Sequence, residues 1–115
     1  MGIEKFEDII AWQKSKILVI EIYKKFNILQ DYSFKDQIKR AAVSIMNNIA
    51  EGYERKGDKE LKHFLFISKG SCGEVRSMLY IARELGYICE DEFNDFYNKS
   101  VEISKLLSGF IKSLN

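Results

Sequence analysis

Few side chains in this sequence are suited to catalysis: one histidine, His63, and two cysteines, Cys72 and Cys89. A nearby histidine can activate a cysteine thiolate, but nine residues of helix turn His63 and Cys72 to opposite sides. The spacing of the two cysteines matches no zinc finger, and a lone histidine excludes a two-histidine metal site within one chain. We therefore expect no catalytic residues, metal or cofactor, with a small enzyme as the remote alternative.

A row of cations is the pattern that could bind nucleic acid. Its members recur at intervals of seven residues, which is nearly two helical turns, so they share one side of a helix. They are Lys62, Lys69, Arg76 and Arg83. At 1.5 Å per residue the row is roughly 31 Å long, enough to follow a phosphate backbone with salt-dependent affinity. Secondary candidates are Lys39, Arg40, Arg55 and Lys56. The alternative is a solvated helix surface, in line with a formal net charge of only +1.

A polar stripe lies upstream of this row. Its members are Arg40, Ser44, Asn48, Glu51 and Arg55. Their spacing confines them to roughly 80° of a helix, beside an apolar side that includes Ile38, Ile45 and Ile49. One interpretation is a solvated surface with i,i+4 ion pairs such as Glu51 with Arg55. The other is a partly buried polar network for assembly, formed by Ser44, Asn48 and Glu51 at a seam between helices or subunits.

Length and composition limit what must position these residues. The chain has 115 residues, 46% hydrophobic and 30% charged, which indicates one globular domain over residues 1–115 rather than a disordered chain. No apolar run approaches the roughly 20 residues of a membrane span. Without a recognisable signal peptide, reduced thiols and a soluble, cytoplasmic protein that does not bind membranes are expected.

Four segments show the helical 3.6-residue period, and none alternates as a strand would. The predicted helices span about 7–26, 33–56, 58–85 and 91–112. Ser33 and Asp58 are expected as N-caps, while Gly57 and Gly86 are expected after helix C-termini. Long helices with short connections predict an all-α fold, an antiparallel up-down-up-down four-helix bundle.

Two helices carry further signals. The middle of the first, from Ile17 to Tyr23, is apolar on every side, so we expect another subunit to cover its outer side. The alternative is that Leu18, Val19 and Ile22 are scattered exposed residues. In the third, the segment 68–74 contains Gly70 and Gly73, which could form a phosphate-binding loop. Helical phase continues through it, so we favour small residues that let helices approach closely.

Most of the chain resembles the four-helix-bundle family known as 23S rRNA-intervening sequence proteins. The residues that carry the resemblance are Arg40-Ala41-Ala42-Val43-Ser44-Ile45, Asn48-Ile49-Ala50-Glu51-Gly52, Arg55, Phe64-Leu65, Ser71 and Glu74. The start, Phe6-Glu7-Asp8-Ile9 with Ala11-Trp12-Gln13, and the later turn Leu85-Gly86-Tyr87-Ile88 are similar as well.

This resemblance implies a bacterial, cytoplasmic protein that assembles into a ring-like homopentamer and has no established biochemical activity. The chain is also similar to the accessory protein of diversity-generating retroelements, a pentamer thought to bind nucleic acid and a reverse transcriptase. Those relatives are strongly basic, whereas this chain is nearly neutral. We therefore expect a non-enzymatic homo-oligomer, with RNA or DNA binding as the first hypothesis and a protein-interaction scaffold as the alternative.

Overall fold

The computed structural model describes residues 2–114, which form four α-helices after one short 3-10 helix. They are η1 (Phe6–Asp8), α1 (Ile10–Phe26), α2 (Tyr32–Glu54), α3 (Asp58–Glu84) and α4 (Glu90–Ser113). No strand occurs within residues 2–114, so the predicted all-α class is confirmed. The predicted domain, 1–115, includes Met1 and Asn115, which lie outside the described residues.

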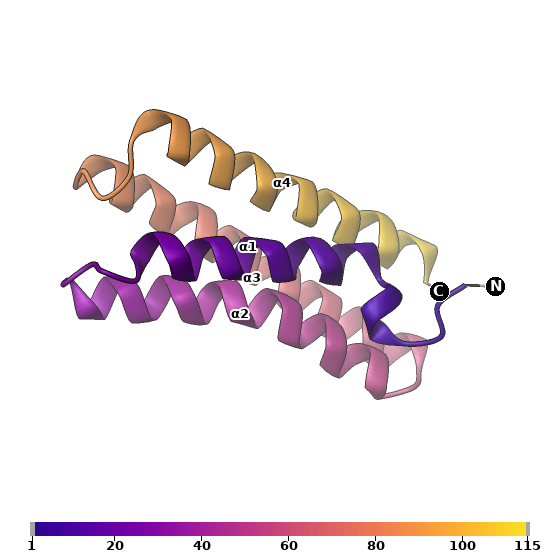
Figure 1. Cartoon of the computed structure of the whole chain (residues 1–115). Coiled ribbons are helices and arrows are strands. Elements are labelled where there is room, and N and C mark those ends of the chain that lie inside the picture. The colour runs from indigo at the N-terminus through magenta and orange to yellow at the C-terminus, as the bar shows by residue number, and fades with distance from the viewer. Residues whose placement is uncertain (1, 115) are drawn as a thin grey trace.

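The four helices occupy the corners of a bundle about 44 Å long. Each helix contacts the one before and after it, and α1 also contacts α4, which closes the bundle. Across the described residues no Cα atom of α1 lies within 8 Å of one in α3, and none of α2 lies within 8 Å of one in α4, so these pairs stand diagonally in the bundle. Figure 1 shows the chain reversing direction from each helix to the next, which is compatible with the expected up-down-up-down connection.

The N-cap residues of α2 and α3 differ from those predicted from the sequence. Asp31, and not Ser33, caps α2: its carboxylate accepts a hydrogen bond from the backbone N–H of Phe34 at 3.1 Å. Ser33 lies inside the first turn of α2. Asp58 is likewise the first residue of α3, after an N-cap at Gly57. Both predicted caps were wrong by one or two residues, because several capping residues stand close together there.

The turn between α2 and α3 also contradicts a prediction. The left-handed conformation falls on Lys56, with φ of 61°, while Gly57 is extended with φ of −168°. The prediction for Gly86 is confirmed, since it has φ of 75° and follows the last turn of α3. There the N–H of Tyr87 bonds to the carbonyl of Ala82 at 2.8 Å, and the N–H of Gly86 to that of Arg83 at 3.0 Å.

One apolar core runs through the bundle, with residues from all four helices. The largest fully buried side chains are Phe26, Leu18, Ile22, Ile38, Ile45, Ile49, Leu65, Leu79, Ile103 and Leu107. The predicted core of α2 is therefore correct at its three isoleucines. In α1 the alternative of scattered exposed residues is wrong for Leu18 and Ile22, which are fully buried, and Val19 is half-buried. No helix in the described part of the chain is long and apolar enough to cross a membrane.

Candidate functional site

The polar stripe of α2 divides into two parts with different surroundings. Ser44 and Asn48 are half-buried against α3. The hydroxyl oxygens of Ser44 and Ser71 are 2.8 Å apart. The Asn48 amide donates to the Ser44 carbonyl at 2.8 Å and to its hydroxyl at 2.9 Å. These residues form the partly buried network of the second interpretation, at a seam within one chain.

The other part of the stripe is solvated. Glu51 and Arg55 are exposed and form an i,i+4 ion pair at 2.9 Å, as the first interpretation expects. The Arg55 guanidinium also lies 3.6 Å from the Glu60 carboxylate and 4.9 Å from the centre of the Phe64 ring. Because these charges are paired at the surface, they contribute little to stability. Glu51 therefore does not belong to the buried network.

Glycine and serine serve different purposes at the α2–α3 seam. Gly52 is buried, and a Cβ atom there would lie 2.7 Å from the Cβ of Phe64, so only glycine allows this approach. Serines contact neighbouring helices elsewhere: the Ser68 hydroxyl donates to the carbonyl of Ile45 at 2.7 Å, and the Ser100 hydroxyl to that of Cys72 at 3.1 Å. The sequence did not indicate these serine contacts, since serine is equally common on helix surfaces.

In segment 68–74 the expected close approach of helices at small residues occurs at Ser68, Ser71 and Cys72, and not at Gly70 and Gly73. Segment 68–74 is regular helix within α3, which excludes the phosphate-binding loop. Ser68, Ser71 and Cys72 are buried against other helices, whereas Gly70 is exposed and Gly73 half-buried. A Cβ atom on Gly70 would have nothing within 4 Å, so the bundle itself does not require glycine there.

The cation row lies along α3, on the side that meets α4. The Arg76 guanidinium donates to the Ser100 hydroxyl at 3.3 Å. Arg83 lies 4.0 Å above the Phe93 ring and 3.4 Å from the Glu90 carboxylate. Lys62 and Lys69 are half-buried and form no ion pair within residues 2–114. Two of the four cations are therefore held by α4, and two remain available to an anionic partner.

The secondary cations do not gather in one place. The Lys39 ammonium lies 4.6 Å from the centre of the Tyr23 ring, on the α1 side of α2. Arg40 lines a groove on the α3 side of the same helix. Arg55 is paired with acids, and Lys56 stands in the turn. These four residues therefore do not extend the cation row into one basic surface.

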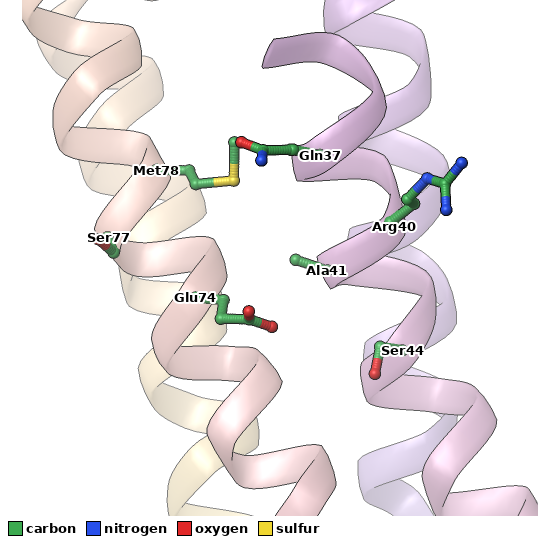
Figure 2. Close-up of a pocket in the computed structure, with 7 residues that line it drawn as sticks. All are labelled: Gln37, Arg40, Ala41, Ser44, Glu74, Ser77 and Met78. Carbon is green, nitrogen blue, oxygen red and sulfur yellow. The ribbon is translucent and has the colours of Figure 1, made fainter. Parts of the chain in front are cut away.

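That groove, of about 530 Å³, runs between α2 and α3. It is lined by Gln37, Arg40, Ala41 and Ser44 from α2 and by Glu74, Ser77 and Met78 from α3. Figure 2 shows Gln37 and Met78 pointing toward each other across it. Glu74 has no ion-pair partner among the described residues. The groove is open to solvent and mixes amide, hydroxyl, charged and apolar groups, which suits contact with another polypeptide more than binding of a small molecule.

The exposed surfaces of the four helices fall into two classes. The exposed residues of α4 include no apolar side chain, and those of α2 are polar apart from Tyr32. In contrast, the exposed residues of α1 and α3 include several large apolar side chains among polar ones. The α1 face consists of Ile10, Gln13, Lys16, Ile17, Ile20, Tyr23 and Lys24. On α3 the first turn exposes the charged residues Asp58, Lys59 and Glu60, and the α3 face that follows consists of His63, Phe66, Ile67, Gly70, Glu74, Ser77, Tyr80, Ile81, Glu84 and Leu85. Exposed apolar side chains grouped on one side of a helix are typical of surfaces that contact another protein.

The histidine and cysteines do not form a reactive site. His63 is exposed and its ring contacts Phe64, while Cys72 is fully buried. Burial raises the pKa of the Cys72 thiol to about 11, despite the nearby charge of Arg76, so the thiolate is disfavoured. Cys89 is exposed at the other end of the turn after α3. No group of three or more His, Cys, Asp or Glu side chains within residues 2–114 is arranged to hold a metal ion.

Comparison with known proteins agrees with this architecture. A family model described as 23S rRNA-intervening sequence protein matches residues 7–109. A solved structure of a protein of unknown function from the S23 ribosomal protein family of Bacteroides thetaiotaomicron is similar, with a TM-score of 0.83 and 25% sequence identity. The match covers 90% of this chain and 96% of that one. No curated protein matches the chain.

Proposed function

Because the chain belongs to the 23S rRNA-intervening sequence protein family, we propose that it is a non-enzymatic protein that assembles with copies of itself into a scaffold. The similar solved structure is of unknown function, and no enzyme family is indicated. The proposal therefore rests on the surface of the molecule. A homopentamer of up-down-up-down bundles, as the resemblance implies, is the stoichiometry proposed.

The observation that supports assembly is the contrast between apolar α1 and α3 faces and polar α2 and α4 surfaces. Ile10 and Ile17 are 51% and 52% exposed, and Phe66 and Ile81 are 55% and 47% exposed. Complete burial of such a side chain stabilises by roughly 1.5–3 kcal/mol, so covering the half that remains exposed contributes about 1 kcal/mol each. Several such residues on two faces can support a specific contact between copies.

The oligomeric state tests this proposal directly. Multi-angle light scattering after size exclusion is expected to show an oligomer at micromolar concentration. Replacing Ile17 and Ile20 by glutamate is expected to dissociate it, because two charges would be buried in an apolar contact. Ile28→Glu is the matched control, since Ile28 is 87% exposed and lies between α1 and α2. A monomeric wild-type protein would contradict the proposal.

RNA or DNA binding is the second candidate function. It is supported by Lys62 and Lys69, which have no ion-pair partner within the described residues, and by the family's description, which refers to 23S rRNA. The two lysines are about 10.5 Å apart along α3, and an assembly of several copies would repeat this pair on every copy. Such an array would bind phosphates with an affinity that falls steeply with salt.

Salt-titrated binding to a structured RNA and to duplex DNA tests this second function. Charge reversal at Lys62 and Lys69 is expected to weaken binding and to flatten the salt dependence. The matched control reverses Lys105 and Lys112, which are exposed on α4. Arg76 and Arg83 are unsuitable for reversal because both contact α4. Equal affinity of the reversed and wild-type proteins would contradict the nucleic-acid role.

A further inference from the structure

We propose that the contact between copies is heterologous: the α1 face of one copy packs against the α3 face of the next. This inference rests on the proposed self-assembly and specifies its partner surfaces. It concerns a second copy of this chain, and it differs from two symmetric alternatives in which α1 meets α1 or α3 meets α3.

The positions of the two faces support this arrangement. Since α1 and α3 stand at diagonally opposite corners of the bundle, with no Cα atoms within 8 Å of each other, their outer sides point away from one another. Figure 1 shows α2 and α4 completing the bundle beside α1. A symmetric dimer through one face would leave the other apolar face exposed. Heterologous contacts use both faces of every copy and leave none exposed once the ring closes.

The charges on the two faces are complementary. The two charged residues of the α1 face, Lys16 and Lys24, are both cationic, and neither forms an ion pair within the described chain. From His63 to Leu85 the charged residues of the α3 face, Glu74 and Glu84, are anionic and form no ion pair within the described chain, whereas the exposed cation Lys59 lies one turn before this stretch. The lysines are roughly 12 Å apart along the helix and the glutamates roughly 15 Å, a difference that flexible side chains can span. Contact between identical faces would instead oppose like charges.

The shapes of the two faces are complementary as well. Gly70 and Ser77 form a low strip on α3, bounded along the helix by the larger Phe66 and Ile81. Glycine weakens a helix interior, and the bundle gives no packing reason for it at position 70. Close approach of a partner helix does give such a reason. The Ile17 and Ile20 side chains, 52% and 44% exposed, are large enough to fill the space above that strip.

Mixing two variants distinguishes the heterologous contact from both symmetric ones. Ile20→Glu disables the α1 face and Gly70→Arg disables the α3 face. Each variant alone is expected to be monomeric. Their equimolar mixture is expected to form a one-to-one heterodimer by native mass spectrometry, through the α1 face of the Gly70→Arg chain and the α3 face of the Ile20→Glu chain. If either variant dimerises alone, the contact is symmetric and the inference is wrong.

A second experiment exchanges the charges of the α1 and α3 faces within one chain, so that the ring can still close. Reversal of Glu74 and Glu84 to lysine is expected to raise the dissociation constant of the oligomer at least tenfold. Adding Lys16→Glu and Lys24→Glu to the same chain is expected to return the dissociation constant to the wild-type value. Absence of restoration would overturn the inference. All these positions are exposed, so helical circular dichroism should be unchanged. A monomeric wild type would contradict the self-assembly itself, whereas an oligomeric wild type without restoration contradicts only the pairing of the two faces.

Discussion

Gly52 on α2 and Phe64 on α3 approach so closely that a Cβ atom at position 52 would lie 2.7 Å from the Phe64 Cβ. The Leu61 side chain would be 3.2 Å from the same point. These contacts explain a glycine inside a helix, where it would otherwise reduce stability. They also give a structural role to the glycine that ends the Asn48-to-Gly52 motif.

Gly52→Ala is expected to lower the free energy of unfolding by about 1–3 kcal/mol, because overpacking outweighs the gain in helix propensity. Urea unfolding would measure the change. Gly109→Ala is the control, since Gly109 lies in α4 and a Cβ there has nothing within 4 Å. The control is expected to stabilise by about 0.5–1 kcal/mol. Equal stabilisation by both substitutions would contradict the close approach.

The link between Asp31 and Tyr87 predicts a pH dependence. The Tyr87 hydroxyl donates to the Asp31 carboxylate at 2.7 Å, and this bond, with the one from the Phe34 N–H, holds the pKa of Asp31 below its ordinary 3.8. The ionised form is thus favoured in the folded state. Its contribution to stability is present above the ordinary pKa and is lost as the pH falls through the lower folded-state value.

Tyr87→Phe is expected to raise the pKa of Asp31 toward its ordinary value, as measured by NMR titration of the carboxyl carbon. The ring contact with Phe34 would remain, since it does not need the hydroxyl. Tyr32→Phe, at an exposed tyrosine, is the control and should leave Asp31 unaffected. An unchanged Asp31 titration in Tyr87→Phe would show that the hydrogen bond is absent in solution.

The two cysteines are expected to react with thiol reagents at very different rates. Cys72 is fully buried with a raised pKa, whereas Cys89 is exposed. A chromogenic disulfide reagent should therefore modify one thiol per native chain rapidly and two only after denaturation. In Cys89→Ser the rapid phase should vanish. Two rapid thiols in the native protein would contradict the packing of α3 against α4.

Arg83 is expected to stabilise the fold, in contrast to Lys62 in the same row. Its guanidinium lies 4.0 Å from the centre of the Phe93 ring and 5.3 Å from the centre of the Tyr80 ring, and these two rings contact each other. Arg83→Gln should lower the free energy of unfolding by roughly 1 kcal/mol, through loss of both cation–π contacts. Lys62→Gln should change it by less than about 0.5 kcal/mol. Equal effects in urea unfolding would show that the row is a uniform solvated surface.

The sequence by itself determined the helical class and the approximate bounds of the four helices. Apolar periodicity and glycine punctuation mark these features locally, as at Gly86, where φ is 75°. Core positions followed wherever one side of a helix is clearly apolar, as with Ile38, Ile45 and Ile49. The resemblance carried by the Asn48-to-Gly52 motif indicated the family, which the match over residues 7–109 confirms.

Only the tertiary structure decided what each helix side contacts. In α1 the apolar residues point in every direction, so periodicity could not show that Leu18 is buried and Ile17 exposed. Regular spacing placed the four cations on one side of α3, but it could not show that Arg76 and Arg83 contact Ser100 and Phe93, which come from a distant segment. The same limit applies to Gly70 and Gly52, which are chemically identical. Their different roles arise because a neighbouring helix lies against one and solvent against the other.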